Sequence, residues 1–480
     1  MRPEVLLIYP KTGVEVVRTP LSVLAVAAPL CQEGYNVKVI DLRITKNFKE
    51  KIKSSSKTAL AVGISAMTGH QIISGLEAAE IVRETNSNLP IVWGGFHPTL
   101  LSEQTIKHPL VDAVVAGQGE NTFLECVQKL EKNKPFNGIK GLIFKENGKI
   151  YRNQKREFED IKKFPPMPYH LVDVEDYILK DISGRSLDYI SSRGCPHRCG
   201  FCAISKFCGR KWQWLEPKRV VEEIKELKEK YKVDGIKFED DNFFVSKERA
   251  GQIFQEILAQ KLDIKWFAMC RCNYFANYEE KYIDLMKKSG AHEINFGAES
   301  GSPKILNMID KDITTDQIIK CAEICKNYDI TTSFSFMMGF PHETFEDLKH
   351  TLTLMGKVHK TNPKAEMAMN IYAPYPGTEL YELAVKEGFK EPNSLEEWGV
   401  FSHNKAVTPW ITGNYKQLLE ALSYISWFVY SPTLESKLKK KYLQIAFRLL
   451  RAFEMFRWKH RFFAFPLEYA LIKYYREIFR

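Results

Sequence analysis

The sequence predicts an α/β protein with a Rossmann-like N-terminal domain, a partial (β/α)6 barrel of the TIM type and a helical C-terminal region. Apolar runs of strand length alternate with helical patterns twice along the chain, which is the pattern of parallel sheets. A proline-rich stretch separates the two alternations, and beyond Gly388 the pattern becomes helical, aromatic and increasingly basic. With 480 residues, 44% hydrophobic and 27% charged, the chain can build several cores of ordinary globular type.

The first alternation occupies residues 1–137 and predicts a doubly wound sheet. Its strand candidates are Glu4–Tyr9, Val37–Leu42, Ala59–Ser65, Pro90–Trp93 and Asp112–Ala116, with helical patterns such as Leu21–Glu33, Gln71–Thr85 and Asn121–Leu130 between them. Residues 138–184 then predict a β-hairpin, with Asn147-Gly148 as the turn, and a proline-rich linker at Phe164–Pro168.

The second alternation occupies residues 185–390 and predicts six βα units of a partial barrel. Its strand candidates are Asp188–Ser192, Gly235–Glu239, Ile264–Arg271, Glu293–Gly297, Thr332–Met338 and Glu366–Tyr372. Such barrels carry their active site at the carboxyl ends of the strands. We therefore expect functional residues in the loops that follow these strands.

Three of the ten cysteines, Cys195, Cys199 and Cys202, form a C-x3-C-x2-C loop after the first barrel strand. The N-terminus resembles a β-strand and not an export signal, so we expect a cytoplasmic protein without a disulfide framework. Metal binding is the better explanation for three cysteines this close together. The other seven cysteines are scattered, and we predict that they are small core residues.

Three thiolates suit an iron–sulfur cluster, because a four-iron cluster held by three cysteines keeps one iron open to a small molecule. Structural zinc is the alternative. It normally closes with four ligands, so it would have to recruit His197 or Cys208.

The cysteine loop, with Phe201 before its last cysteine, resembles the signature of the radical S-adenosylmethionine (SAM) superfamily. That resemblance implies a [4Fe-4S] cluster on the three cysteines and SAM on the open iron, where reductive cleavage generates a 5′-deoxyadenosyl radical. It also implies an electron donor such as flavodoxin or ferredoxin. The SAM contacts implied at the strand ends are Phe201, Asp240, Asp241, Glu299, Gly339 and Pro341.

The first domain resembles the cobalamin-binding domains that precede radical SAM barrels. Glycines at the ends of its strands would let backbone approach a large macrocycle, and helix N-termini could supply donors to its amides and phosphate. The resemblance implies cobalamin contacts at Pro20, Ser22, Ser65, Thr68, Gly94, Gly95, His97, Gly117, Gly119 and Glu120.

Two departures qualify this resemblance. The Asp-x-His-x-x-Gly signature, whose histidine binds cobalt, is absent from the sequence, and the usual Gly-Glu-Gly-Glu is Gly117-Gln118-Gly119-Glu120. We therefore expect cobalamin with its base displaced and no histidine on the metal, and a structural role for His97 beside Pro98. A degenerate Rossmann domain that binds nothing, or another nucleotide, is the alternative.

Both resemblances together predict a cobalamin-dependent radical SAM C-methyltransferase (class B) that acts on an unactivated carbon of a lipid-like or other complex substrate. The alternative is a cyclase or rearranging enzyme with cobalamin but no net methyl transfer. Residues 1–187 lack the extra cysteines of methylthiotransferases, and a cobalamin carrier or sensor would not need the cysteine loop. Beyond the cluster, only Tyr372 and Tyr375 are candidate catalytic residues, by position.

Residues 391–480 carry most of the net charge of +10, because residues 431–480 hold twelve Lys/Arg against four Glu. Leu438, Tyr442, Ile445, Leu449, Phe453 and Phe456 recur at helical spacing among basic residues, and a second aromatic helix follows Pro466. This pattern predicts either peripheral contact with the inner face of a membrane or a helical cap on the barrel whose basic face is solvated. No nucleic-acid-binding module accompanies the charge.

Overall fold

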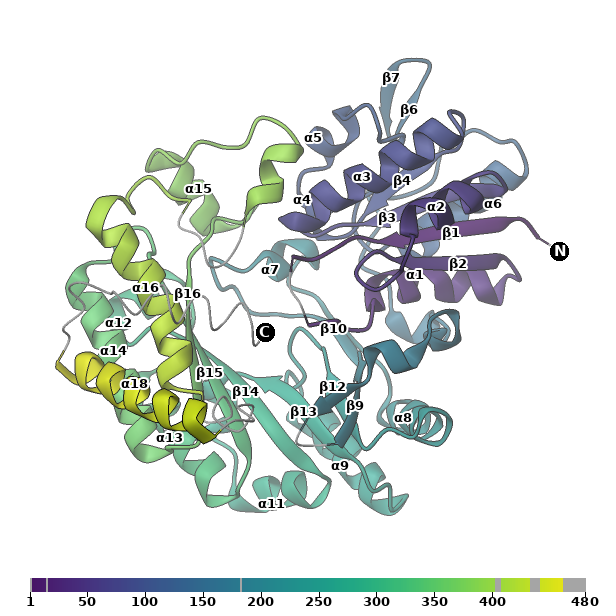
Figure 1. Ribbon diagram of the computed structural model, residues 1–480. Coiled ribbons are helices and arrows are strands. Elements are labelled where there is room, and N and C mark those ends of the chain that lie inside the picture. The colour runs from purple at the N-terminus through teal and green to yellow at the C-terminus, as the bar shows by residue number, and fades with distance from the viewer. Residues whose placement is uncertain (1, 14–15, 182–183, 402–406, 432–440, 461–480) are drawn as a thin grey trace.

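The computed structural model contains two seven-stranded sheets, one in each predicted α/β part of the chain, and they lie next to each other (Figure 1). It describes residues 2–13, 16–181, 184–401, 407–431 and 441–460. The predicted stripe residue Leu438 and the predicted second aromatic helix lie outside these residues. Short 3-10 turns, η1 (Ile161–Lys163), η2 (Tyr169–Leu171) and η3 (Val174–Tyr177), carry the chain from the first sheet to the second.

The first sheet has the strand order β2-β1-β3-β4-β5-β6-β7, with the first five strands parallel. Its strands are β1 (Glu4–Tyr9), β2 (Asn36–Asp41), β3 (Ala59–Ser65), β4 (Ile91–Gly94), β5 (Ala113–Val115), β6 (Leu142–Glu146) and β7 (Lys149–Arg152). Its helices are α1 (Leu21–Gln32), α2 (Phe48–Ser56), α3 (His70–Thr85), α4 (Phe96–Leu100), α5 (Ser102–Lys107) and α6 (Glu120–Glu131). From β1 the sheet grows to one side with β2 and to the other side with β3, so the direction of strand order changes between β1 and β3. Doubly wound sheets bind ligands at such a switch point.

Alternate residues of β1 serve two separate cores. Val5 and Leu7 pack with residues of α1 and α6, whereas Leu6 and Ile8 pack with residues of α2 and α3 on the other face. This two-residue period explains why a continuous apolar run forms a strand buried on both faces. The predicted β6–β7 hairpin is present and extends the sheet as its antiparallel edge.

The second sheet has the order β16-β15-β14-β13-β12-β9-β8, and its six strands β9 to β16 are parallel. Its strands are β8 (Leu179–Asp181), β9 (Gly184–Tyr189), β12 (Gly235–Phe238), β13 (Lys265–Cys270), β14 (Ala291–Glu299), β15 (Thr331–Met338) and β16 (Glu366–Ile371). Its helices are α8 (Pro217–Tyr231), α9 (Lys247–Ala259), α10 (Cys272–Phe275), α11 (Glu280–Lys288), α12 (Pro303–Met308), α13 (Thr315–Asn327), α14 (Phe345–Thr361) and α15 (Glu379–Lys386). The predicted partial (β/α)6 barrel is confirmed.

The first barrel strand ends at Tyr189, three residues before the predicted end at Ser192. The difference arises because Ser192–Gly194 forms a separate short strand, β10, which pairs antiparallel with β11 (Trp212–Trp214). This ribbon brackets residues 195–211, which contain the cysteine loop and the short helix α7 (Ala203–Phe207). The loop is therefore anchored at both of its ends.

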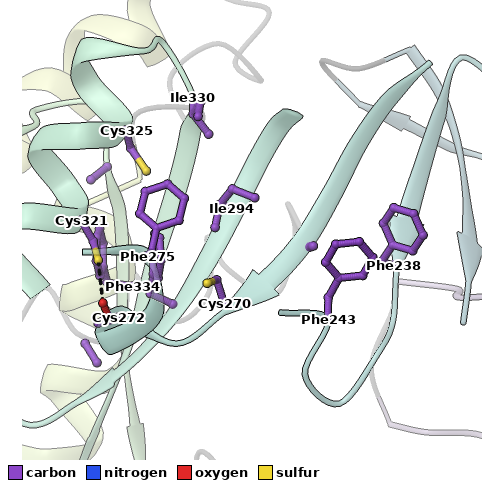
Figure 2. Close-up of a cluster of buried hydrophobic side chains, with 14 of the residues drawn as sticks. Phe238, Phe243, Cys270, Cys272, Phe275, Ile294, Cys321, Cys325, Ile330 and Phe334 are labelled. Carbon is purple, nitrogen blue, oxygen red and sulfur yellow. Dashed lines mark hydrogen bonds between the residues drawn. The ribbon is translucent and has the colours of Figure 1, made fainter. Parts of the chain in front are cut away.

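The cysteines outside the loop are mostly core residues, as predicted. Cys126, Cys208, Cys270, Cys272, Cys321 and Cys325 are buried, and Cys31 is half-buried. Figure 2 shows four of them on the helix side of the barrel sheet, near Phe275, Phe334 and Ile294. The Cys321 thiol donates to the carbonyl of Cys272. These thiols fill space between strands and helices in the way that small apolar residues do.

The C-terminal region contains η4 (Glu396–Val400), α16 (Gly413–Val429) and α18 (Lys441–His460). Trp398 of η4 is buried against the first domain, where its indole donates to Gln104 Oε1. Helix α16 lies along β16, and Ser426 and Tyr430 accept the backbone amides of Met369 and Met367. This arrangement covers an otherwise unpaired sheet edge. None of the helices within the described residues is long and apolar enough to cross a membrane.

Candidate functional site

A cavity of about 400 Å³ lies between the two domains, where the carboxyl ends of their strands meet. The wall from the first domain follows β1, β3, β4 and β5, and its deep part is apolar, with Leu7, Val92 and Phe123. The wall from the barrel follows β9 and β12 and includes Arg193 and Gly194 of β10, directly before Cys195, and Phe207 of α7. The three cysteines themselves do not line this cavity. One cavity therefore adjoins both the glycine-rich strand ends of the first domain and the cysteine loop of the barrel.

Seven of the ten residues predicted to contact cobalamin line this cavity, although they come from four different loops. They are Ser22, Ser65, Gly94, Gly95, Gly117, Gly119 and Glu120. Ser22 and Ser65 share a hydrogen bond of 3.0 Å across the mouth of the β1–β3 switch point.

The glycine-lined wall depends on missing side chains at two positions. Gly95 has a φ of +102°, and a Cβ there would lie 2.7 Å from the carbonyl oxygen of Ala66. Gly94 has no such conflict, because its Cβ would meet only Val115 at 3.7 Å. A side chain at Gly95 would strain the backbone, whereas a side chain at Gly94 would enter the space that a ligand needs.

Pro20, Thr68 and His97, the other three predicted contacts, do not line the cavity. The imidazole of His97 is buried, its Nδ1 lies 2.9 Å from Thr68 Oγ1, and the ring meets the edge of Trp398. Burial lowers the pKa of His97 to about 4. His97 thus holds the loop after β4 against the C-terminal region.

The three cysteines of the loop lie at the carboxyl end of the barrel. Cys199 is buried, whereas Cys195 and Cys202 are half-buried. Backbone bonds fix the loop on both sides: Gly200 donates to the carbonyl of Ile309, and Leu380 donates to that of Gly200. Burial raises the pKa of the Cys195 thiol and raises that of Cys202 to about 12. A positively charged metal centre is what favours the thiolate form of such thiols.

Two side chains from later strand ends donate to these sulfurs. Arg271, after β13, approaches Cys199 Sγ at 3.3 Å, and Asn242, after β12, approaches Cys195 Sγ at 3.7 Å. Sequence reasoning did not single out either residue, although both follow barrel strands. Hydrogen bonds to cluster sulfurs are one of the means by which a protein sets the potential of an iron–sulfur centre.

Glu299, a predicted SAM contact, is buried and paired with Lys311 at 2.7 Å. Its φ of +60° is unusual for a residue with a side chain and turns the end of β14. Burial opposes the charged form of Lys311, but Glu299 and Cys199 raise its pKa. Arg271 also donates to the carbonyl of Lys311, so two buried cations stand beside the cysteine loop.

The adjacent predicted contacts Asp240 and Asp241 have different surroundings. Asp240 is fully buried and accepts hydrogen bonds from the Ser191 amide, the Ser191 hydroxyl and the Ser192 hydroxyl. These bonds hold the bend between β9 and β10. Asp241 accepts from the Gly194 amide at 2.7 Å and lines the cavity. Burial raises the pKa of Asp241 to about 6.

Two of the remaining predicted residues, Phe201 and Tyr372, belong to an aromatic cluster around Phe340. The Phe201 ring lies 6.3 Å from Phe340, which lies 5.3 Å from Tyr372. The Tyr372 hydroxyl is buried without a hydrogen bond in the described part of the chain, and Tyr375 is half-buried. Gly339 and Pro341 flank Phe340 in the loop after β15. Glu343 accepts the amides of Gly339 and Phe340, and burial raises its pKa to about 7.

Three ion pairs join the domains at the cavity. Arg18 of the first domain contacts Asp188 and Glu239 of the barrel, and Arg193 of the barrel contacts Glu120 of the first domain. All five residues line the cavity. Burial raises the pKa of Glu239 to about 7, although Arg18 opposes that shift. Of these five, sequence reasoning found only Glu120.

The side chains that a zinc site would recruit are engaged elsewhere. His197 Nε2 lies 2.5 Å from the Tyr274 hydroxyl, and the Cys208 thiol donates to the Ile204 carbonyl. Within the described residues, no three His, Cys, Asp or Glu side chains gather as ligands of a single ion. A four-iron cluster spaces its cysteine sulfurs further apart, because each sulfur binds a different iron.

Comparison with known proteins decides the family. A profile of the Radical SAM superfamily matches residues 189–355, and a profile of the B12 binding domain matches residues 13–127. An uncharacterized methyltransferase of Pyrococcus horikoshii is 35% identical over 392 residues, which are 80% of this chain and 83% of that protein. The chain is a radical SAM enzyme with a cobalamin-binding domain.

Two more distant proteins extend the comparison. The enzyme is 26% identical over 373 residues to an anaerobic magnesium-protoporphyrin IX monomethyl ester cyclase of Rubrivivax gelatinosus, covering 76% of this chain and 66% of that one. Its fold is similar to that of the radical SAM methyltransferase TsrM from Kitasatospora setae with cobalamin and a [4Fe-4S] cluster bound. The TM-score is 0.69 at 18% identity, covering 82% of this chain and 80% of that one.

The cofactors of this radical SAM enzyme are a [4Fe-4S] cluster, SAM and cobalamin. The residues present fit these groups. One loop carries three thiols with donors directed at two of the sulfurs, and the cavity at the β1–β3 switch point is lined by glycines together with apolar and polar side chains.

Proposed function

We propose that this enzyme transfers a methyl group to a carbon atom of a lipid-like or other complex substrate. The observation that carries the proposal is the single cavity that adjoins both the glycine-rich strand ends of the first domain and the cysteine loop of the barrel. A methyl carrier and a radical generator must act on one substrate carbon, so their sites have to open into one space.

When bound, the cluster and SAM supply hydrogen abstraction, and cobalamin supplies a methyl group. The chain's residues have the task of holding these groups and excluding water. Cys195, Cys199 and Cys202 are the proposed cluster ligands, with Arg271 donating to Cys199 Sγ. The apolar walls at Leu7 and Phe123 would keep water from the cobalamin side.

Some of the predicted SAM and cobalamin contacts line the cavity, whereas others are bonded within the protein. We propose that Asp241 and the seven cavity residues of the first domain contact the bound cofactors, because they line the cavity. Asp240, Thr68 and His97 are already engaged in bonds within the protein, so we propose that they position neighbouring loops. The proposed electron donor is a flavodoxin or a ferredoxin, which would reduce the cluster.

Cyclisation without net methyl transfer is the second candidate, because a relative with 26% identity is named as a cyclase. The two reactions differ in product mass. Methyl transfer adds one CH2 unit to the substrate, and cyclisation adds none.

The experiment is anaerobic incubation of the loaded enzyme with a reductant, a lipid extract of the source cells and SAM carrying a deuterated methyl group. A lipid that gains the deuterated methyl in mass spectrometry supports the proposal. SAM consumption with products that gain no label contradicts methyl transfer and favours cyclisation or rearrangement. A Cys195→Ala, Cys199→Ala, Cys202→Ala triple variant is the matched control, because it should bind corrinoid but generate no radical.

A further inference from the structure

Helix α18 is held against the barrel by one face. The Phe447 ring lies 4.6 Å from Phe428, and the Trp458 ring lies 5.3 Å from Tyr430. Arg451 Nε donates to the carbonyl of Val429 at 2.9 Å. These contacts join α18 to α16, which itself covers β16, at the outer edge of the barrel in Figure 1. These contacts fix the orientation of α18 relative to α16.

The opposite face of α18 carries the predicted apolar stripe, whose members within the described residues are exposed. Its members, with their exposed fractions, are Tyr442 (62%), Ile445 (50%), Leu449 (69%), Phe453 (52%) and Phe456 (59%). At 3.6 residues per turn they fall within about 80° of one another, opposite Phe447 and Trp458. They are five of the thirteen large apolar side chains that are exposed in the described part of the chain.

The charge beside this stripe is positive. Lys441 and Arg448 are exposed on its flank. Arg448, Arg451 and His359 of α14 line a shallow groove of about 330 Å³ with Ala452 and Met455. The one carboxylate of α18, Glu454, is buried beside Arg457 and does not reach this surface. Guanidinium groups are suited to phosphate, because they present several donors in a fixed fork.

We propose that this face of α18 docks the enzyme on the surface of an anionic lipid bilayer. The stripe would enter the boundary between headgroups and acyl chains, and the groove of Arg448, Arg451 and His359 would receive headgroup phosphates. An apolar stripe flanked by cations is the arrangement by which interfacial helices bind such surfaces. The basic sequence of residues 431–480 adds to the same attraction.

Charge complementarity favours a bilayer over the other occupants of such a face. A second copy of this chain would bring Lys441 and Arg448 of two molecules towards one another. Residues 461–480 carry four Lys/Arg against two Glu, so they too would bring positive charge to a positive flank. Docking of α18 on a bilayer is independent of the reaction that the enzyme catalyses.

The experiment is cosedimentation of the full-length, cofactor-loaded enzyme with vesicles. One set contains phosphatidylglycerol and phosphatidylcholine, and the other contains phosphatidylcholine alone. We expect binding to the anionic set, weakened by salt, and at least a tenfold weaker affinity for the Leu449→Glu, Phe453→Glu double variant. Arg448→Glu should weaken binding to the anionic set. The matched control is Leu258→Glu, an exposed leucine on α9, which should bind as the wild type does.

Folding of each variant is checked by its iron and corrinoid content and its unfolding temperature, which should not change because the replaced side chains are exposed. Equal affinity of the wild type and the double variant would overturn the proposal. A dimeric wild type and a monomeric double variant in analytical ultracentrifugation would also overturn the proposal, because they would identify the stripe as a subunit interface. Binding that appears only after removal of residues 461–480 would show that the tail covers the stripe and would also overturn it.

Discussion

The guanidinium of Arg18 makes a bidentate contact with the carboxylate of Asp188, 170 residues further along the chain. Arg18 Nε donates to Asp188 Oδ2 at 3.1 Å, and Arg18 Nη2 lies 2.7 Å from Asp188 Oδ1. The Thr19 amide donates to the same carboxylate. Because Asp188 is almost fully buried, this contact ties the loop that opens α1 to the first strand of the barrel at the wall of the cavity.

Replacing Arg18 by alanine should lower the free energy of unfolding by about 1–3 kcal/mol, because the buried Asp188 would lose its charged partner. Denaturant unfolding of the protein without cofactors measures the change. The matched control is Arg2→Ala, which removes an exposed pair with Glu33 and should cost no more than about 1 kcal/mol. An equal effect of the two substitutions would contradict a structural role for the Arg18–Asp188 contact.

Arg271 should raise the reduction potential of the cluster, because a donor to Cys199 Sγ favours the more negative, reduced state. The Arg271→Gln variant should therefore have a lower midpoint potential in a redox titration followed by EPR, with its iron content unchanged. Arg198→Gln is the control. Arg198 belongs to the cysteine loop, but its side chain is exposed and pairs with Asp310 and Asp312. The Arg198→Gln variant should therefore keep the midpoint potential of the wild type. Equal potentials in all three proteins would refute the assignment.

His97 should make the protein less stable at low pH without binding cobalt. Its pKa in the folded state is about 4, below the ordinary value of 6.5, so the unfolded state binds more protons between these values. Stability should fall as the pH drops from about 6.5 to about 4, and less steeply in His97→Gln. The EPR spectrum of the bound corrinoid in its Co(II) state should be the same in both proteins. A nitrogen hyperfine splitting that is present in the wild-type spectrum and absent from that of His97→Gln would instead identify His97 as a cobalt ligand.

Gly94→Val should weaken corrinoid binding by at least tenfold while leaving the fold intact. A side chain at Gly94 meets only Val115 at ordinary contact distance, so its bulk enters the cavity. Corrinoid absorbance after gel filtration reports the loss, and cluster iron in the same sample serves as the internal control. The comparison variant Gly95→Ala should instead lower stability, because its Cβ would clash with the Ala66 carbonyl. Full corrinoid retention in Gly94→Val would argue against this cavity as the cobalamin site.

The fold could be predicted from the sequence because both sheets are built from short apolar runs separated by helices, a pattern that is local. The cysteine loop could also be predicted, because its residues are consecutive. The partners Arg18 and Asp188 could not, since neither belongs to a local pattern and only the packing of the two domains brings them together. Arg271 was missed because it is 72 residues from Cys199 in the sequence, and only the folding of the barrel brings the two together. The exposure of Leu449 and Phe453 was likewise hidden, because periodicity shows that a helix is amphipathic but not which face packs.

One chain should hold a three-cysteine cluster and cobalamin at the two domains that face the shared cavity. The measurement that tests it most directly is quantification of iron, sulfide and corrinoid after anaerobic purification with cobalamin, for the wild type and the Cys195/Cys199/Cys202 triple-alanine variant. We predict about four irons and about one corrinoid per chain in the wild type, with only the iron lost in the variant. Zinc in place of iron, or iron without corrinoid in the wild type, would contradict the account.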